Sequence, residues 1–337
     1  MEQKNGRNNL IMTTFTTTTS KWDGDPAKDR DKYIGGSDIG TILGLNPWKS
    51  AFTLWAEKTH KIDTPDISDK ESVWWGNYDE EGVAKRFCEK TGKKVHRSLK
   101  NYSIAEYPFL IGHIDRAVVG ENAGLECKTT SSFNKTDFDN GEIPPAHYAQ
   151  VQLYMLVTGA AYWYYAVKRD NFQFFYQQVN RDDDFIENTM IPAAVVFWKA
   201  VQEDTPIKPD GSESSADTLS ALYPGMEAPK KGKDTPIILL PDKITDKLET
   251  YLQLNEAEKQ IKDQKGEIAN EVKALMKDYR KGSTGSYSVS WSRSTKTVID
   301  KDRLEAERPD IFEHYKQVKP NDRLTIRKKK EKEENNG

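Results

Sequence analysis

The alternation of apolar and polar residues divides the chain into a dense N-terminal part and a sparser C-terminal part. Between residues 30 and 204, apolar side chains recur at spacings typical of both strands and helices. They predict strands at 94–99, 109–119, 125–129, 161–167 and 172–179, and helices at 37–43, 77–91, 144–158 and 183–203. This order predicts an α/β domain built on a mixed sheet.

Glycine and serine residues mark several of these boundaries. Gly92 is expected to end the helix at 77–91, and the Gly- and Asn-rich segment 120–124 is expected to form a turn between two strands. Ser37 is expected to cap the helix at 37–43, which is entered through Gly35 and Gly36.

The C-terminal third has a different composition. Residues 205–235 are rich in Pro, Gly, Ser and Asp and are interpreted as a linker. Beyond them, apolar residues at helical spacing predict one long helix or a helical hairpin, compatible with a coiled coil: Leu248, Leu252, Ile261, Ile268, Val272, Leu275 and Tyr279. The expected organisation is a flexible segment (1–29), a main domain (30–204), the linker, a helical extension with a small β region (236–327) and a disordered tail (328–337).

Composition narrows the class of protein. No apolar run is long enough to span a membrane, and the Thr-rich N-terminus lacks the apolar stretch of a signal peptide. Two cysteines, Cys88 and Cys127, cannot form a four-cysteine metal cluster, and a reducing cytoplasm is expected. Net charge is −3, yet residues 85–100 hold seven Lys or Arg against one acid. That cluster suits nucleic-acid phosphates, and it equally suits a solvated helix face.

The candidate chemistry lies in Gly112-His113-Ile114-Asp115 and Gly124-Leu125-Glu126-Cys127-Lys128. If the two strands pair antiparallel about the turn, Asp115 lies opposite or diagonal to Glu126 and Lys128, on the same face. Two carboxylates and an ammonium group then meet at one place, which suits Mg²⁺ and phosphodiester chemistry. The alternative is an ordinary surface salt bridge between Glu126 and Lys128.

Further residues occur in a compatible order. Glu80 is expected in the first turn of the helix at 77–91, Gln150 lies on the helix at 144–158, and Arg30 precedes Gly35-Gly36-Ser37-Asp38-Ile39-Gly40. Together these motifs resemble the lambda-exonuclease and YqaJ-type phage recombinase family of the PD-(D/E)xK nuclease superfamily, over residues 30–204. Residues 300–304 and 309–310 resemble the tail of the YqaJ-type branch. The proline of the motif is absent, because Ile114 precedes Asp115.

The resemblance implies a restriction-endonuclease-like core and a set of site residues. Asp115, Glu126 and the backbone carbonyl of Cys127 would bind Mg²⁺, with Mn²⁺ as a substitute, and Lys128 would position the attacking water. Glu80 would support the metal site, and Gln150 would hold Lys128 or the scissile phosphate.

The resemblance also implies a grip on the 5′-terminal phosphate by Arg30 and Ser37. A shift of register would put Lys28 or Lys32 in the place of Arg30. The implied activity is a Mg²⁺-dependent exodeoxyribonuclease that resects double-stranded DNA ends in the 5′–3′ direction and leaves 3′ overhangs. A homo-oligomer such as a ring trimer, a RecT-like single-strand annealing partner and a phage or prophage setting in the host cytoplasm are implied as well.

Other interpretations remain beside this one. An endonuclease of the same fold, a non-catalytic DNA-binding or scaffold protein, and a protein whose main functional unit is the C-terminal helix are the rival functions. Gln152 competes with Gln150, and His113 shares the face of Asp115 but has the usual features of a structural histidine. The aromatic run 162–165 is interpreted as core strand rather than as a base-stacking surface.

Overall fold

The computed structural model describes residues 17–18, 28–98, 100–131, 142–170, 172–224, 237–317 and 323–329. The chain forms two compact units, Met1–Gly225 and Met226–Gly337. The helical segments of the first unit are η1 (Arg30–Lys32), α1 (Gly36–Ile42), α2 (Ala51–Lys58), α3 (Glu71–Thr91), α4 (Pro145–Thr158), α5 (Asp183–Phe185), η2 (Ile186–Met190), α6 (Ile191–Gln202) and α7 (Glu213–Leu222). Its strands are β1 (Thr17–Thr18), β2 (Val95–Arg97), β3 (Asn101–Ile104), β4 (Tyr107–His113), β5 (Arg116–Val118), β6 (Gly124–Thr130), β7 (Tyr162–Arg169) and β8 (Gln173–Asn180).

A five-stranded sheet organises the first unit, with the strand order β2-β5-β6-β7-β8. Strands β6 and β7 run parallel, whereas the other neighbouring pairs are antiparallel. The parallel pair needs a crossover connection, and α4 provides it. A second sheet has the order β1-β3-β4. The α/β fold with a mixed sheet, expected from the sequence, is therefore confirmed.

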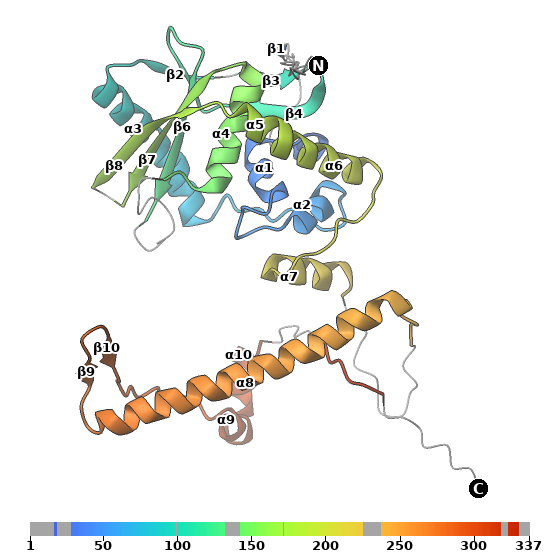
Figure 1. Ribbon diagram of the computed structural model, residues 1–337, viewed down its shortest axis with the longest axis vertical. Helices are drawn as coiled ribbons and strands as arrows, with labels where there is room; N and C mark the ends of the chain where they lie inside the picture. The colour runs from blue at the N-terminus through green and yellow to red at the C-terminus, as the bar shows by residue number, and fades with distance from the viewer. Residues whose placement is uncertain are drawn as a thin grey trace, which may run out of the picture. The chain divides into compact units, whose positions relative to one another are not determined.

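The interior strand β7 shows how the sheet is sandwiched between helices. Trp163, Tyr165 and Val167 pack with α4 residues on one face, whereas Tyr164 and Ala166 pack with α3 residues on the other. Figure 1 shows α3 and α4 on opposite sides of the sheet. Because strand side chains alternate between faces, an aromatic run buried on both sides is expected for an interior strand. The interpretation of 162–165 as core is thus confirmed.

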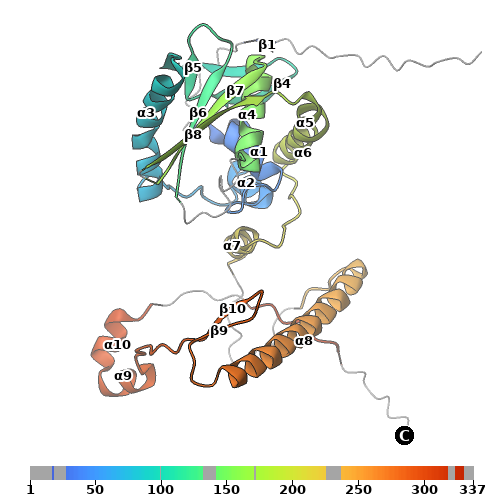
Figure 2. The same cartoon turned by 60° about the vertical axis from the view of Figure 1, so that its left-hand side comes forward.

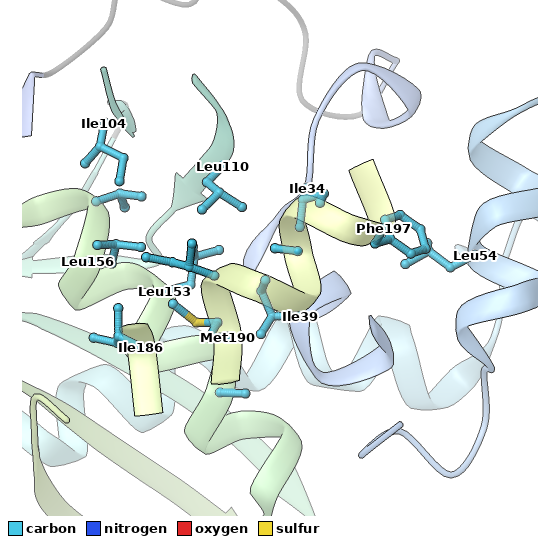
Figure 3. Close-up of a cluster of buried hydrophobic side chains, with 14 of the residues drawn as sticks. Ile34, Ile39, Leu54, Ile104, Leu110, Leu153, Leu156, Ile186, Met190 and Phe197 are labelled. Carbon is cyan, nitrogen blue, oxygen red and sulfur yellow. The ribbon is translucent and has the colours of Figure 1, made fainter. Parts of the chain in front are cut away.

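A further apolar cluster lies where α1, α2, α4 and α6 meet the second sheet (Figure 3). It draws residues from segments far apart in the sequence, such as Ile34, Leu110, Leu153 and Phe197. Ile34 also bridges Leu110 through a parallel β-bridge. This cluster anchors the segment that carries Arg30 and α1 against the rest of the unit.

Three local expectations were wrong. The strand expected at 109–119 is two strands, β4 and β5, which belong to different sheets and separate at Ile114 and Asp115. The helix expected from residue 77 begins at Glu71, because Gly76 is tolerated inside it. Ser37 does not cap α1: Gly35 is the N-cap, and the Asp38 carboxylate accepts a hydrogen bond from its N–H at 3.0 Å.

Part of the expected linker at 205–235 is folded. Residues of α7 join α2 through hydroxyl groups: the Thr53 Oγ1 lies 2.7 Å from the hydroxyls of both Ser214 and Thr218, and Ser215 donates to Ser50. Ser212 caps α7. A serine-rich composition was interpreted as a flexible connection, but here these hydroxyls form the contact between two helices.

The second unit is built on one long helix. It contains η3 (Asp242–Ile244), α8 (Thr245–Met276), β9 (Lys281–Ser283), β10 (Ser288–Ser290), α9 (Lys301–Glu307) and α10 (Pro309–Tyr315), visible in Figure 2. The sequence left open one long helix or a helical hairpin, and α8 is one continuous helix. The expected flexible segment 1–29 and disordered tail 328–337 fall largely outside the described residues. None of the helices within the described ranges has the length and apolarity required to cross a membrane.

The packing of β6 against β7 generates a test of the fold. A Cβ added at Gly124 would lie 2.0 Å from Cζ2 of the buried Trp163, whereas one added at Gly82 in α3 would meet nothing within 4 Å. We expect Gly124→Ala to lower the free energy of unfolding by about 1–3 kcal/mol or more through overpacking. Gly82→Ala should instead raise it by about 0.4–1 kcal/mol. Urea titration of both variants measures the difference, and equal effects would contradict the packing described.

Candidate active site

Three side chains predicted from the sequence meet where the chain leaves the second sheet and enters the first. The register of β5 with β6 pairs Arg116 with Leu125, which brings Asp115 beside Glu126. The Cys127 N–H donates to Asp115 Oδ2 at 3.4 Å, and Lys128 Nζ lies 2.5 Å from Glu126 Oε1. Glu126 is only 1% exposed, so this is no surface salt bridge.

The electrostatics of the site are dominated by two neighbouring carboxylates in a buried place. Burial raises the pKa of Asp115 to about 7, and the charge of Glu126 adds to this increase. Burial alone would lower the pKa of Lys128, but Glu126 and Asp115 outweigh it and hold this pKa above its ordinary value. The pair of carboxylates thus favours a proton, a lysine or another cation beside it.

Gln150 on α4 joins the site through Glu126. Its Nε2 donates to Glu126 Oε1 and to the Tyr154 hydroxyl, each at 2.8 Å. The expectation that Gln150 holds Lys128 does not match this geometry, because Lys128 and Gln150 both reach the same oxygen of Glu126. The other amide, Gln152, binds the carbonyl of Asn180 and the N–H of Asp182 and lies outside the site.

Two histidines lie near the site in structural surroundings. His113 Nδ1 lies 2.6 Å from Asn101 Oδ1, and its ring packs edge-on against Tyr33. Burial, with a contribution from Lys128, lowers the pKa of His147 to about 3, and its Nδ1 lies 2.6 Å from the Tyr165 hydroxyl. His147 is therefore a neutral neighbour of Lys128.

Glu80 does not lie where the sequence suggested. It occupies the third turn of α3 rather than the first, and its Oε1 forms a 2.5 Å ion pair with Arg116 Nη1. The Arg116 side chain is 4% exposed, and it also donates to Glu81 Oε2 at 3.0 Å and to the Asp115 carbonyl at 3.1 Å. Glu80 thus acts on the site through Arg116, which holds the backbone of Asp115 from the α3 side of the sheet.

The donor set suits a hard divalent cation. Glu126 Oε2 is buried and has no hydrogen-bond partner among the described residues. Within those residues no three His, Cys, Asp or Glu side chains gather as a metal cluster, so protein side-chain ligands would be Asp115 and Glu126. Mg²⁺ commonly binds through one or two carboxylates and keeps several waters. The residues therefore fit this ion, and the carbonyl of Cys127 stays a predicted ligand.

Arg30 and Ser37, which the resemblance assigns to the 5′-phosphate, lie side by side. Arg30 Nη2 donates to the exposed Ser37 hydroxyl at 3.4 Å and lies 3.8 Å from Asp38 Oδ1. The buried Lys58 binds the other oxygen of Asp38 at 3.0 Å. Of the alternatives to Arg30, Lys32 forms an ion pair with Asp29 at 2.6 Å. The three side chains of Arg30, Lys58 and Asp38 leave one net positive charge beside Ser37.

Tyr154 connects this basic cluster with the carboxylates. Its hydroxyl receives the hydrogen bond from Gln150, and its ring lies so close to α1 that a Cβ at Gly36 would be 2.7 Å from Cε1. Gly36 is the residue before Ser37. The positions of Ser37 and Glu126 are therefore coupled through one buried ring.

Sequence reasoning missed several of these residues. Tyr154, Arg116 and Lys58 carry no motif, because each acts through contacts made by distant segments. A further missed feature is an exposed group of three rings on α3, in which Trp74 stacks on Tyr78 at 5.2 Å and Trp75 packs edge-on against both. Their dense spacing in the sequence was a signal for an exposed aromatic surface.

The order Asp115, then Glu126-x-Lys128 on paired strands with helices on both faces, is the arrangement of a PD-(D/E)xK core. A sequence model described as a YqaJ-like viral recombinase domain matches residues 27–161. The uncharacterized protein YqaJ of Bacillus subtilis (strain 168) is 35% identical over 292 residues, covering 86% of this chain and 89% of that protein. The chain belongs to the YqaJ-like viral recombinase family.

Solved structures of other proteins show limited similarity to this chain. An alkaline exonuclease, LHK-Exo from Laribacter hongkongensis, is 17% identical with a TM-score of 0.46, covering 52% of this chain and 91% of its own. A phage-related exonuclease from Haemophilus somnus 129PT is 12% identical with a TM-score of 0.39, covering 51% and 96%. At these values the likenesses say nothing about individual residues or substrates.

The ion pair of Glu80 with Arg116 predicts that Glu80 contributes more to the stability of the fold than its neighbour Glu81 does. Glu80→Ala removes a charged hydrogen bond from a buried guanidinium, so we expect a loss of about 1.5–3 kcal/mol in the free energy of unfolding. Glu81→Ala removes an exposed partner of the same guanidinium and should cost less than about 1 kcal/mol. Denaturant unfolding compares them, and a neutral Glu80→Ala would show that this ion pair does not hold α3 to the sheet.

Proposed function

We propose that the chain is a divalent-cation-dependent exodeoxyribonuclease that resects one strand of a duplex end from its 5′ terminus and leaves a 3′ overhang. The observation that carries the proposal is the meeting of Asp115, Glu126 and Lys128 at one place, where Glu126 is buried and bound by Gln150 while Asp115 and Lys128 are half-buried. Family membership supports the same class of reaction.

Each side chain of the site has a role in this proposal. Asp115 and Glu126 would hold Mg²⁺ or Mn²⁺, which polarises a phosphodiester and lowers the pKa of a bound water. Lys128, held by Glu126, is placed to orient the attacking water and to offset negative charge that develops on the phosphate. Gln150 fixes the orientation of Glu126, and Arg116 fixes the backbone at Asp115.

The proposed direction of digestion comes from the family resemblance, and the cluster at Arg30 and Ser37 is the proposed contact for the 5′-terminal phosphate. An exposed guanidinium beside an exposed hydroxyl offers several donors to a terminal phosphate. Through Tyr154 and Gln150 this cluster is coupled to Glu126, so an end bound there would be held in a defined relation to the carboxylates. The exposed rings of Trp74, Trp75 and Tyr78 supply stacking surfaces suited to unpaired bases.

The proposal extends to partners on the strength of the family resemblance. A homo-oligomer, such as a ring trimer around the duplex, would keep the enzyme on its substrate. A single-strand annealing protein would coat the 3′ overhang. Both expectations concern assembly and do not depend on the chemistry of the site.

Lys128→Ala and Asp115→Ala test the site. Each should lower the Mg²⁺-dependent digestion of linear duplex DNA by about 100-fold or more, because each removes a group that acts on the reacting atoms. Lys199→Ala is the matched control, since the exposed Lys199 pairs with Glu203 at the end of α6. Circular dichroism should be unchanged in all three variants.

Substrates distinguish the rival activities in the same assay. An exonuclease spares covalently closed circles, digests linear duplexes in the presence of Mg²⁺ and stops when a chelator is added. Cleavage of closed circles would show an endonuclease. Full digestion by the Lys128→Ala or Asp115→Ala variant would refute the site assignment.

Arg30→Ala tests the end-binding cluster. The protein should digest duplexes with 5′-phosphate faster than those with 5′-hydroxyl ends, and Arg30→Ala should reduce this preference by about tenfold, the equivalent of one charge-assisted contact. Lys32→Ala serves as the control because Lys32 is paired with Asp29. The same preference in the Arg30→Ala variant, or its loss in the Lys32→Ala variant, would contradict the role of Arg30.

A further inference from the structure

The helix α8 exposes an aliphatic stripe along its length. All residues between 253 and 271 are exposed in the structure. Three of them, together with Leu275 further along the helix, recur every seven residues and form what we call the α8 stripe. Its members have exposed fractions of 62%, 57%, 62% and 83%: Leu254, Ile261, Ile268 and Leu275. Most of the stability of a helix in water comes from packing of its apolar face, so a stripe of this length requires a cover.

The spacing identifies the kind of cover. When the α8 stripe occupies the d positions of a heptad repeat, the a positions are Tyr251, Glu258, Lys265 and Val272. A seven-residue repeat is the pattern by which one helix packs along another. The a and d positions together form the seam along which a second helix would pack. Both ends of this seam are apolar, whereas its middle has opposite charges at two successive a positions, Glu258 and Lys265.

The charges distinguish the two ways in which a second copy of α8 could pack. In a parallel pair, a positions face each other, so Glu258 would meet Glu258 and Lys265 would meet Lys265. In an antiparallel pair, each a position faces a d position, and one alignment uses the whole seam. Its layers, each occurring twice by symmetry, are Tyr251 with Leu275, Leu254 with Val272, Glu258 with Ile268 and Ile261 with Lys265.

The antiparallel alignment also brings opposite charges together. Glu258 of one copy and Lys265 of the other fall in neighbouring layers, three residues apart along the axis, or about 4.5 Å. Their aliphatic stems can pack in the seam while the charged ends meet at its edge. Because the contact is symmetric, two such ion pairs form for each pair of helices.

We infer that α8 is a self-association surface and that its occupant is a second copy of α8 packed antiparallel. The α8 stripe forms the d layer of this coiled coil, and the alternation of Glu258 and Lys265 selects the antiparallel direction over the parallel one. The inference concerns the C-terminal unit and is independent of the nuclease activity proposed for the first unit.

Charge reversal in the full chain tests both the partner and the direction. In the antiparallel pair, Glu258→Lys brings the new lysine of each copy beside Lys265 of the other copy. Lys265→Glu brings the new glutamate of each copy beside Glu258 of the other. Each single variant should raise the dissociation constant of self-association by about tenfold in sedimentation equilibrium over a dilution series. The double variant with both changes should restore it to within about twofold of the original protein.

Matched controls separate this contact from other sources of association. Glu256→Lys and Lys259→Glu change the same charges on the outer face of α8 and should leave the dissociation constant unchanged. Association through the first unit is the same in all variants, so differences between them report on α8. Ile261→Asp combined with Ile268→Asp should abolish the association step that the charge variants weaken.

Three results would overturn the inference. One is a dissociation constant that does not change in the Glu258→Lys and Lys265→Glu variants. Another is a double variant that associates no better than either single variant, because opposite charges then do not meet across the pair. The third is an unchanged mass in the variant with aspartate at 261 and 268, which would mean that another surface covers the α8 stripe.

Discussion

Two carboxylates held side by side, Glu126 buried and Asp115 half-buried, are the constraint on which the rest of the first unit depends. Asp115 and Glu126 repel each other and lose hydration where β5 departs from β6, and burial raises the pKa of Asp115 to about 7. Such a pair persists only if the surrounding structure holds it and if positive charge lies beside it. Lys128 supplies part of this charge, and the partnerless oxygen of Glu126 has the character of a ligand for a cation.

The neighbouring elements hold this pair from both faces of the sheet. On the α4 side, Gln150 and Tyr154 fix Glu126 and extend the contact to α1, where Ser37 and Arg30 lie. On the α3 side, Arg116 binds Glu80 and the carbonyl of Asp115. The site is therefore rigid where the chemistry is proposed, because its first contacts are made by side chains that are themselves buried and bonded.

The convergence of Asp115, Glu126 and Lys128 could be predicted because it rests on local rules. Strand alternation places Glu126 and Lys128 on one face, and a short Gly-rich turn brings the preceding segment back beside them. The family resemblance implied a common role for Arg30 and Ser37, with Lys28 or Lys32 as alternatives to Arg30. The ion pair of Glu80 with Arg116 was not predicted. Arg116 lies on β5, and the residue spacing within α3 gives no information about a partner on a strand.

By itself, the sequence determined most of the helices and strands of the sheet, the aromatic core of β7, the helical period of the segment that forms α8 and the choice of carboxylates, because hydrophobic period and turn residues act over a few positions. It left open whether the α8 segment is one helix or a helical hairpin. Only the tertiary structure decided that the segment at 109–119 breaks at Asp115 to serve two sheets, that α7 packs its serines on α2, and that Gln150 binds Glu126. These outcomes depend on contacts between segments far apart in the chain. Local propensity carries no information about such partners, so the energy of packing and of buried hydrogen bonds selects among arrangements that the sequence pattern leaves equivalent.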